Sequence, residues 1–484
     1  MFEGEGSHDF YRDRICCGSH VYDTLEDALG CGLDYHRRGD LPAAAEVYDC
    51  ILAAFPGCAE AGFYRALIHT SLAEHELAIG LYRQVMAAGP FPPALFYQMG
   101  MSWAGLGSLE LAADCFRDAL REDPDHFEAW YNLGVVRQKA GEMEEAAAAY
   151  QRGLALCPDD YDLLFNLALV MRRLDRLKDS EELFNRALSI EPDDCEAHYN
   201  LGLVYRDMGE LAEAISSFGR SLEINPDFAV AINNLGILLV EIGAREQALK
   251  CFKRCIELDH RVPSARHMVA ALTGETTPGP PREYVRSLFD HFSPAFEALL
   301  VKNLDYRTPS MLRSIFDRHA DPRRPVENTL DLGCGTGLCG EVFRDLTRFL
   351  SGVDLSARMV EAAETKGCYD ELQVGDLLDY LKSSPRRFDL LVAADVLVYL
   401  GELQPLFQEA APRLIEGGYF LFSTELSEEE GVKLRQTGRY AHSTAYIKTC
   451  LERNGFSLVH CAPADIRRER GEWLKGCLHL ARKG

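Results

Sequence analysis

The sequence predicts two folded parts, an α-solenoid followed by an α/β domain built on a mostly parallel sheet of seven strands. Two observations lead to this fold class. Prolines recur every 34 residues through the first half of the chain, and a fixed period of this length indicates stacked helical units. In the second half, short apolar runs alternate with helical segments, which is typical of a parallel sheet covered by helices. A chain of 484 residues also exceeds what one hydrophobic core usually serves.

The repeating units are recognised by positions that recur at the same place in each of them. The recurring prolines are Pro56, Pro90, Pro124, Pro158, Pro192 and Pro226, and His260 holds the next place. Position 8 is small in every unit: Gly32, Ala66, Gly100, Gly134, Ala168, Gly202 and Gly236. Position 24 is aromatic in every unit: Tyr48, Tyr82, Phe116, Tyr150, Phe184, Phe218 and Phe252. We expect the small residue to face the ring, which lets two helices approach closely.

Glycines between the two helical stretches of a unit predict a left-handed residue that ends the first helix. They are Gly39, Gly107, Gly141, Gly209 and Gly243. The pattern resembles the tetratricopeptide repeat, and Trp130 to Pro158 follows that family almost position for position. The second unit departs most, with Ala66, His69 and Ala73 in place of the usual Gly, Tyr and Gly. The resemblance implies seven repeats and a capping helix over residues 25–272, after a tail of residues 1–24, and a groove that holds another protein.

Four units carry an asparagine at position 6, on the first helix of the unit. They are Asn132, Asn166, Asn200 and Asn234. Because an amide both donates and accepts, a row of amides can bind an extended peptide backbone. This resembles the asparagine ladder of the O-linked N-acetylglucosamine transferase repeats. The alternative is that the amides satisfy neighbouring backbone groups or contact the adjoining domain.

Residues 273–281 combine Pro, Gly and Thr without apolar periodicity, which predicts a linker before a second domain at residues 282–484. The domain begins with two helical patterns, residues 282–300 and 309–320. The strands that we expect after them are Thr329–Leu332, Phe349–Val353, Leu372–Val374, Phe388–Ala393, Gly418–Ser423, Phe456–Cys461 and Trp473–Leu480. A ligand should bind beyond the carboxyl ends of these strands.

The first of these strands runs into a glycine-rich loop with Gly333, Gly335 and Gly337. Such a loop alone is a weak sign of a dinucleotide site. Asp331 stands two residues before the first glycine, where a carboxylate would meet an ammonium group and would repel a pyrophosphate. Asp354 ends the second strand and can accept from two ribose hydroxyls, and Asp376 follows the third strand and can accept from an adenine amino group.

These residues resemble the class I S-adenosylmethionine-dependent methyltransferases, whose domain has a Rossmann-like sheet. The resemblance implies S-adenosylmethionine as cofactor, with Leu355 and Met359 against the adenosine and Leu377 beside the adenine ring. It places Asp395 and Tyr399, after the fourth strand, facing the transferred methyl group. Tyr440 and His442 fall on a segment that covers the active site in many members, and His442 is the candidate general base, with a structural histidine as the alternative.

The resulting hypothesis is an S-adenosylmethionine-dependent methyltransferase whose repeats recruit a protein partner or substrate. The alternatives are a non-catalytic scaffold that binds the cofactor, and a small-metabolite methyltransferase whose repeats only localise it. The repeats followed by such a domain resemble bacterial tetratricopeptide-repeat methyltransferases, and that name implies no methyl acceptor.

Composition limits the other possibilities. A net charge of −24 makes nucleic acid a poor partner. The 16 cysteines are scattered singly, which favours a reducing compartment, and none has ligand neighbours at zinc-motif spacing, so we expect no metal. The absence of a signal-like or membrane-spanning run predicts a cytoplasmic protein. The short basic runs at residues 322–324 and 467–470 are expected to be solvated turns.

Overall fold

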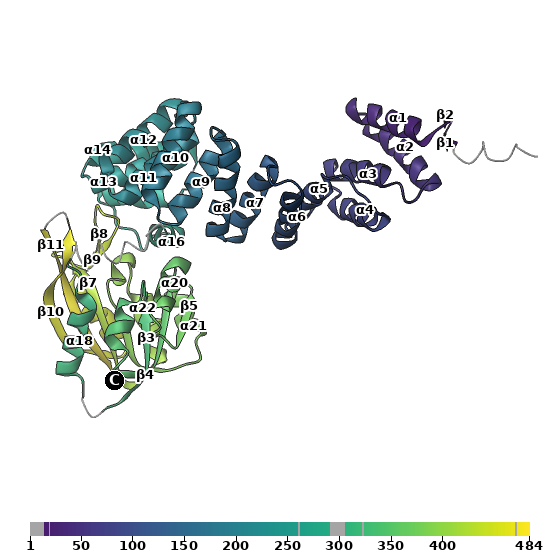
Figure 1. The fold of residues 1–484 in the computed structure, drawn as a ribbon. Helices are drawn as coiled ribbons and strands as arrows, with labels where there is room; N and C mark the ends of the chain where they lie inside the picture. The colour runs from purple at the N-terminus through teal and green to yellow at the C-terminus, as the bar shows by residue number, and fades with distance from the viewer. Residues whose placement is uncertain (1–13, 19, 260–261, 291–304, 322–323, 470–471) are drawn as a thin grey trace, which may run out of the picture. The chain divides into compact units, whose positions relative to one another are not determined.

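The computed structural model describes residues 14–18, 20–259, 262–290, 305–321, 324–469 and 472–484. It forms two compact units, the first ending at Met208 and the second beginning at Gly209 (Figure 1). This division falls between two helices of the repeat array. The sequence predicts a linker between the two domains at residues 273–281, and that domain boundary stays a prediction. Most of the tail, the place held by His260 and the second half of the helical pattern at 282–300 lie outside the described residues.

The first unit consists of a small hairpin and antiparallel helix pairs. The hairpin joins β1 (Ile15–Cys17) to β2 (His20–Tyr22). The helices are α1 (Leu25–Arg37), α2 (Leu41–Ala54), α3 (Ala59–Ser71), α4 (His75–Ala88), α5 (Leu95–Gly105), α6 (Leu109–Glu122), α7 (Phe127–Ala140), α8 (Met143–Leu156), α9 (Tyr161–Arg173), α10 (Leu177–Ile190) and α11 (Cys195–Met208). The helices α1 to α10 form five pairs, each of which corresponds to one predicted 34-residue repeat, and α11 is the first helix of the next predicted repeat.

The predicted contact between a small residue and an aromatic ring is confirmed inside these pairs. A Cβ atom added to Gly100 of α5 would lie 2.8 Å from the ring of Phe116 on α6. Phe116 is completely buried, as are Tyr48, Tyr82 and Tyr150 at the same place in other repeats. Because a larger side chain at position 8 would push the ring out of this interface, the repeat spacing fixes how closely the two helices pack.

The turn between the two helices of a repeat requires a left-handed residue, as the sequence predicts. Gly39, Gly107 and Gly141 have φ values of 79°, 73° and 87°. The two repeats that lack a glycine keep the same conformation, with φ of 60° at Ala73 and 59° at Asp175. A side chain with a Cβ atom is strained in this region, so these two turns are local weak points.

Substituting Ala73→Gly is therefore expected to stabilise the first unit by about 0.5–1 kcal/mol, because glycine adopts this φ without steric cost. Thermal or urea unfolding of the full chain measures the gain. Gly107→Ala, at the equivalent turn two residues before α6, is the matched control and should lower stability. A destabilising Ala73→Gly would show that the turn is not strained.

A disulfide joins Cys17 of β1 to Cys50 of α2 in this structure. The bridge closes a segment of 33 residues between two elements that pack together, and such a link restricts the unfolded chain. The sequence, whose scattered cysteines favour a reducing compartment, did not predict this pair. Cysteines separated by many residues give no sign in the sequence that folding brings them together.

The second unit begins with four helices of the repeat array. They are α12 (Leu211–Ile224), α13 (Ala229–Glu241), α14 (Arg245–Leu258) and α15 (Pro263–Thr273), and α15 lies where the capping helix is expected. The segment that follows is tied to the α/β domain. The backbone N–H of Glu402 donates to the carbonyl of Pro278 over 2.8 Å, and that of Leu434 donates to Thr276 Oγ1 over 3.3 Å.

The α/β domain contains a sheet whose main order is β10-β11-β7-β6-β3-β4-β5. The strands are β3 (Val326–Leu332), β4 (Thr347–Asp354), β5 (Glu371–Val374), β6 (Phe388–Ala393), β7 (Leu414–Leu426), β10 (Phe456–Glu469) and β11 (Glu472–Lys483). All seven predicted strands are confirmed. The strands β5, β4, β3, β6 and β7 are parallel to one another. β11 pairs antiparallel with β7, and β10 pairs antiparallel with β11 at the edge of the sheet. Two three-residue strands, β8 (Val432–Leu434) and β9 (Tyr440–His442), extend β7 and were not predicted.

Helices cover both faces of this sheet (Figure 1). One face packs against α18 (Thr308–His319) and α19 (Leu338–Phe343), through a cluster that includes Leu312, Phe343 and Leu421. The other face packs against α21 (Leu377–Ser383), α22 (Gln404–Ala410) and α23 (Thr444–Arg453). The remaining helical elements are α16 (Arg282–Asp290), α20 (Ala357–Thr365), η2 (Leu397–Tyr399) and η3 (Ala411–Arg413). The described helices include none that is long and apolar enough to cross a bilayer.

Candidate functional site

The glycine-rich loop leaves β3 at the carboxyl edge of the sheet and leads into α19. Gly333, Gly335 and Gly337 all have left-handed backbones, with φ of 71°, 54° and 91°. A Cβ atom on Gly333 would lie 2.5 Å from Val396 Cγ2, so a larger residue does not fit there. The loop therefore holds its backbone close to the ends of β3 and β6, where a ligand of this fold binds.

Asp331 lies at the end of β3 and is 1% exposed. Its Oδ2 accepts a hydrogen bond of 2.7 Å from Tyr369 Oη, and the backbone N–H of Gly340 donates to the same hydroxyl over 3.0 Å. Its Oδ1 is buried and forms no hydrogen bond with the described residues, while the Cys339 thiol also interacts with this carboxyl and lowers its pKa. Burial raises the pKa of Asp331 to about 7, although the Tyr369 hydroxyl acts in the opposite direction. A buried carboxylate oxygen without a hydrogen bond is suited to a cationic ligand.

Asp354 ends β4, the strand next to β3. Its two carboxylate oxygens accept from the backbone N–H groups of Gly335 and Ser356, each over 2.9 Å. Burial raises its pKa, while these backbone donors act in the opposite direction. The charge of Asp354 also raises the pKa of Asp331, so the two carboxylates act on each other electrostatically. The structure thus brings the first two predicted acids together at one edge of the sheet.

Asp376 follows β5 and caps α21. Its Oδ1 accepts from the backbone N–H groups of Leu378 and Asp379 over 2.9 and 3.2 Å. Its Oδ2 lies 3.1 Å from Nε of Arg282 on α16. Both oxygens therefore have partners within the chain, and contact with an adenine amino group stays a prediction.

The apolar residues predicted to contact the adenosine follow these strand ends. Met359 lies in the first turn of α20 and is 3% exposed. Its backbone N–H donates to Ser356 Oγ, which caps the helix. Leu355 and Leu377 are half-buried, and Leu377 packs against the main core of the domain. The three side chains therefore have different surroundings, and their contact with the cofactor stays a prediction.

Asp395 follows β6 and belongs to a buried ionic network that the sequence did not predict. Its backbone is left-handed, with φ of 61°, and its carboxylate forms an ion pair with Arg467 of β10. Arg467 also reaches Glu425 of β7 over 3.3 Å, and Glu425 lies 2.9 Å from Nε of Arg439. Arg467 is 5% exposed, so the expectation that the basic run at 467–470 is a solvated turn was wrong for this residue.

Two tyrosines lie near this network. Burial raises the pKa of Tyr399, and the charges of Arg439 and Arg467 act in the opposite direction. Tyr306, ahead of α18, has its pKa raised by burial and by the charges of Asp395 and Asp331. The charges of both carboxylates thus act on Tyr306, which sequence reasoning missed because no motif surrounds it.

His442 lies in β9 and is fully buried. Its Nε2 is 2.9 Å from the carbonyl oxygen of Gly401 and 3.0 Å from that of Leu400. Since carbonyl oxygens only accept, Nε2 carries the proton. Burial lowers the pKa of His442 to about 4. This geometry favours a structural role for His442, and the role of general base stays a prediction.

Tyr440, two residues earlier in β9, contacts the linker and the last repeat helix. Its hydroxyl lies 2.6 Å from Thr277 Oγ1. Its ring is buried in an apolar cluster with Ala270, Ala271 and Leu434. His267 of α15 reaches the carbonyl of Gly438 in the same loop over 2.9 Å. Tyr440 thus couples α15 to the α/β domain, and its catalytic role stays a prediction.

The four ladder asparagines are half-buried, and their amide nitrogens bind their own helices. Asn132, Asn166, Asn200 and Asn234 each donate from Nδ2 to the backbone carbonyl four residues earlier, over 2.8, 2.8, 2.9 and 2.9 Å. Asn132 also donates to Tyr97 Oη over 3.2 Å. These bonds correspond to the alternative that the sequence left open, in which the amides satisfy neighbouring backbone groups. Binding of a partner by this row stays a prediction.

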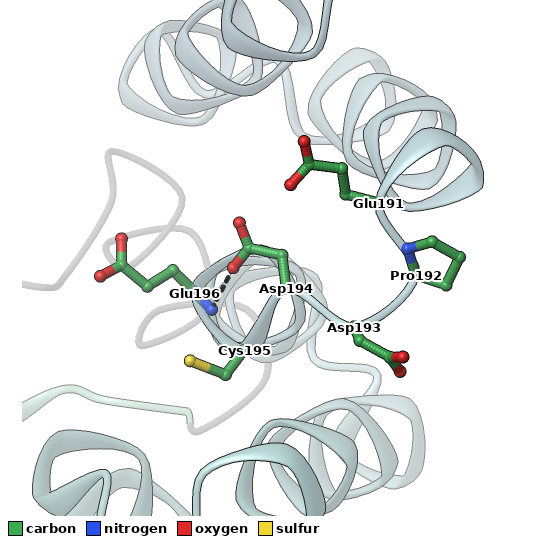
Figure 2. A pocket seen from close by; sticks show the side chains of 6 residues that line it. All are labelled: Glu191, Pro192, Asp193, Asp194, Cys195 and Glu196. Carbon is green, nitrogen blue, oxygen red and sulfur yellow. Dashed lines mark hydrogen bonds between the residues drawn. The ribbon is translucent and has the colours of Figure 1, made fainter.

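A hollow on the first unit lies at the turn between α10 and α11. Its lining is Glu191, Pro192, Asp193, Asp194, Cys195 and Glu196 (Figure 2). The carboxylate of Asp194 stabilises this turn, because the backbone N–H groups of Glu196 and Ala197 donate to its Oδ1 over 2.6 and 3.1 Å. The hollow belongs to the repeat array and contains none of the predicted cofactor residues.

Comparison with known families assigns both parts of the chain. Residues 330–422, from β3 through most of β7, match the family described as a methyltransferase domain. Residues 32–93, 97–161, 161–194, 195–228 and 229–260 match families described as the tetratricopeptide repeat. This chain joins tetratricopeptide repeats to a methyltransferase domain. The matched residues of the methyltransferase domain include Asp331, the three loop glycines, Asp354, Asp376 and Asp395.

Individual relatives resemble only parts of the chain. A ubiquinone biosynthesis O-methyltransferase from Coxiella burnetii is 26% identical over 101 residues, which are 20% of this chain and 43% of that protein. A malonyl-[acyl-carrier protein] O-methyltransferase from Enterobacter lignolyticus is 28% identical over 132 residues, 27% of this chain and 52% of that protein. The chain thus spans about half the length of these curated relatives.

Among solved structures, the C-terminal part of a repeat-containing protein from Cytophaga hutchinsonii is similar to the repeats. It is 13% identical, covers 49% of this chain and 98% of its own, and has a TM-score of 0.45.

Proposed function

We propose that the methyltransferase domain uses S-adenosylmethionine and that the repeats bring a protein substrate, or the carrier of a substrate, to it. The observation that supports the cofactor most strongly is the buried Oδ1 of Asp331, which forms no hydrogen bond with the described residues and stands at the base of the left-handed glycine loop. An ammonium group supplies the missing donors and a compensating charge. The protein groups at this place fit an amino-acid-like cofactor.

Each of the neighbouring residues binds a different part of the cofactor. Asp331 holds the ammonium end, Asp354 accepts from the ribose hydroxyls, and Met359 and Leu377 give apolar contact to the adenosine. The bound cofactor supplies an electrophilic methyl group on a sulfonium sulfur. The chain contributes alignment of the acceptor, because an in-line displacement depends mainly on the positions of the reacting atoms. Asp395 and Tyr399 border the acceptor side of this site.

The recruiting role of the repeats is supported by the contacts of α15. The bonds from His267 to Gly438 and from Thr277 to Tyr440 attach the end of the repeat array to the domain. A partner held on α12–α15 would therefore keep a fixed position relative to the domain that carries the cofactor site. Linking two binding modules in this way raises the effective concentration of one ligand near the other.

Transfer of a labelled methyl group tests the proposal. Wild-type protein is incubated with methyl-labelled S-adenosylmethionine and a size-fractionated lysate, and we expect label in large species. Asp354→Ala should remove the label and weaken S-adenosylhomocysteine binding by about 1.5–3 kcal/mol for each lost charge-assisted hydrogen bond. Calorimetry measures this affinity. Unchanged affinity in Asp354→Ala would contradict the assigned cofactor site.

A variant with all four ladder asparagines replaced by alanine separates recruitment from chemistry. It should keep the affinity for S-adenosylhomocysteine and lose the labelling of large species. Label in small species with either protein would instead support a metabolite acceptor. Cofactor binding without any transfer would support a scaffold.

A further inference from the structure

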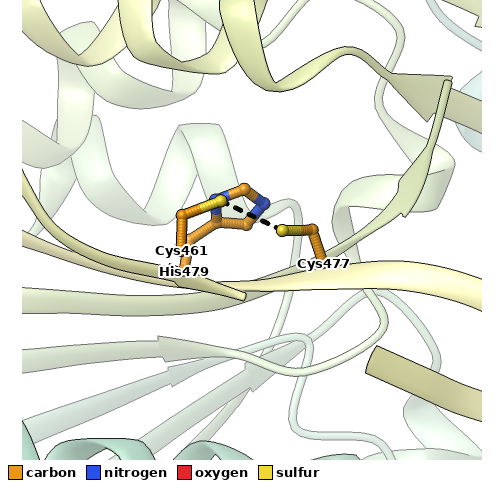
Figure 3. A group of neighbouring side chains, drawn as sticks. All are labelled: Cys461, Cys477 and His479. Carbon is orange, nitrogen blue, oxygen red and sulfur yellow. Dashed lines mark hydrogen bonds between the residues drawn. The ribbon is translucent and has the colours of Figure 1, made fainter. Parts of the chain in front are cut away.

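Two cysteines and a histidine converge on one face of the C-terminal hairpin. The side chains are Cys461 of β10 and Cys477 and His479 of β11, and their ligand atoms all lie within 4.8 Å of one another. Figure 3 shows the two sulfurs pointing toward each other beside the imidazole ring. The Sγ atoms are 3.0 Å apart and both cysteines are free thiols in this structure.

The strand pairing explains why these three side chains meet. Cys461 pairs directly with His479 across the two antiparallel strands, and Pro463 pairs with Cys477. Cys477 and His479 are two residues apart on one strand, so they project from the same face of the sheet. The cluster is thus held by the register of two paired strands and does not depend on a loop.

The two nitrogens of the His479 imidazole have different surroundings. It is fully buried, and its Nε2 lies 3.0 Å from Thr424 Oγ1 on β7. Its ring stacks on Phe422, with centroids 4.7 Å apart. The other nitrogen, Nδ1, is buried and has no hydrogen-bond partner among the described residues. Metal-bound histidines commonly use one nitrogen for the ion while a protein oxygen fixes the other.

We propose that Cys461, Cys477 and His479 bind a zinc ion, with both sulfurs and the imidazole as ligands. Zinc takes tetrahedral sites of thiolate and imidazole groups, and a fourth position remains for water or another ligand. Both thiols release their protons when the ion binds, so two thiolates balance the charge of Zn²⁺. Because two sulfurs bound at about 2.3 Å in a tetrahedral site are about 3.8 Å apart, the thiols must separate by a fraction of an ångström.

The ion would reach the cluster from the edge of the sheet. β10 is the last strand of the main order, and Cys461 on it is half-buried whereas Cys477 is 2% exposed. An ion at this position would join β10 to β11 and, through Thr424, to β7. The site would therefore stabilise the hairpin that ends the methyltransferase domain.

Metal titration of the reduced, metal-free full chain tests the proposal. After dialysis against Zn²⁺, elemental analysis should find one more zinc ion per chain in the wild type than in the ligand variants. With Co²⁺ as the probe, the wild type should show the absorption of a tetrahedral thiolate site. Cys461→Ser and His479→Gln should each lose this absorption and the associated ion. Cys157→Ser, at an exposed cysteine of the first unit, is the matched control and should keep both.

Further variants separate binding from misfolding. Thr424→Val keeps all three ligands but removes the hydroxyl beside Nε2, and it should weaken zinc binding by about 10–100-fold. Circular dichroism shows whether each variant is folded. The proposal is overturned if the reduced wild-type chain binds no ion at this site, or if Cys461→Ser leaves the cobalt spectrum unchanged. A mass decrease showing a Cys461–Cys477 disulfide, with no ion bound by the reduced protein, would also overturn it.

Discussion

Replacing Asp331 by asparagine is expected to weaken S-adenosylhomocysteine binding by about a hundredfold, or about 3 kcal/mol, at pH 7.5. The reason is that the buried Oδ1 loses its negative charge, so the ammonium group of the ligand enters a buried site without a counter-charge. Asparagine has nearly the same shape as aspartate, so packing at the end of β3 is preserved. Calorimetry with the full chain measures the affinity of both proteins.

The wild-type affinity should also depend on pH. Since the pKa of Asp331 is raised to about 7, the carboxyl is mostly protonated at pH 6 and mostly ionised at pH 7.5. Binding requires the ionised form, so affinity should rise by about eightfold over this interval. Asp331→Asn should show no such rise.

Tyr369→Phe provides a matched control for this explanation. It removes the hydroxyl that lowers the pKa of Asp331 but leaves the carboxyl in place. The rise in affinity should therefore move to higher pH and keep its size. A wild-type affinity that is constant from pH 6 to 7.5 would contradict the assignment of Asp331 to the ammonium group.

The parts of the fold that follow from local pattern could be predicted from the sequence. The 34-residue spacing determines which residues face each other inside a repeat, as the contact of Gly100 with Phe116 shows. Apolar runs located the seven main strands, and they are clearest in the central strands β3, β6 and β7, which have consecutive buried residues. The strands β8 and β9 have three residues each, which is too short for a periodic pattern.

The ionic network around Asp395 could not be predicted because a register shift changes the direction of a side chain. The pairing of β10 with β11 shifts between Asp465 and Arg467, and the consecutive residues Ile466 and Arg467 are both buried. Strict alternation along the strand would have exposed one of them. A basic run in the sequence therefore resembles a solvated turn although its first arginine lies inside the domain.

Clusters of side chains from different strands also cannot be recognised in the sequence. Cys461 and His479 are neighbours only because β10 and β11 pair in one register. No spacing rule for zinc motifs includes them, since such rules describe ligands on one short segment or on two knuckles. The three acids predicted to bind the cofactor could be located in the sequence for the opposite reason, because each one lies at or just after the end of its own strand.

The stability contributed by His442 is expected to decrease at acidic pH. The folded pKa is about 4 and the ordinary value is 6.5, so protons bind the unfolded state more readily between these values. The contribution is complete above pH 6.5 and is lost as pH falls toward 4. From pH 7.5 to pH 5 the loss amounts to roughly 2 kcal/mol.

His442→Gln isolates this effect, because glutamine does not titrate and its amide can donate to the carbonyls of Leu400 and Gly401. The difference in unfolding free energy between wild type and variant should shift by the same roughly 2 kcal/mol in favour of the variant at pH 5. This comparison is needed because Asp331, whose pKa is raised to about 7 in the folded state, favours the folded state at low pH and offsets the loss from His442 in the wild type.

The same variant distinguishes a structural histidine from a general base. With a structural role, His442→Gln changes the pH dependence of unfolding and leaves S-adenosylhomocysteine affinity and methyl transfer at neutral pH close to wild type. With a catalytic role, transfer falls steeply while cofactor affinity and the unfolding profile stay as they were. The fully buried ring and the two carbonyl partners of Nε2 lead us to expect the first result.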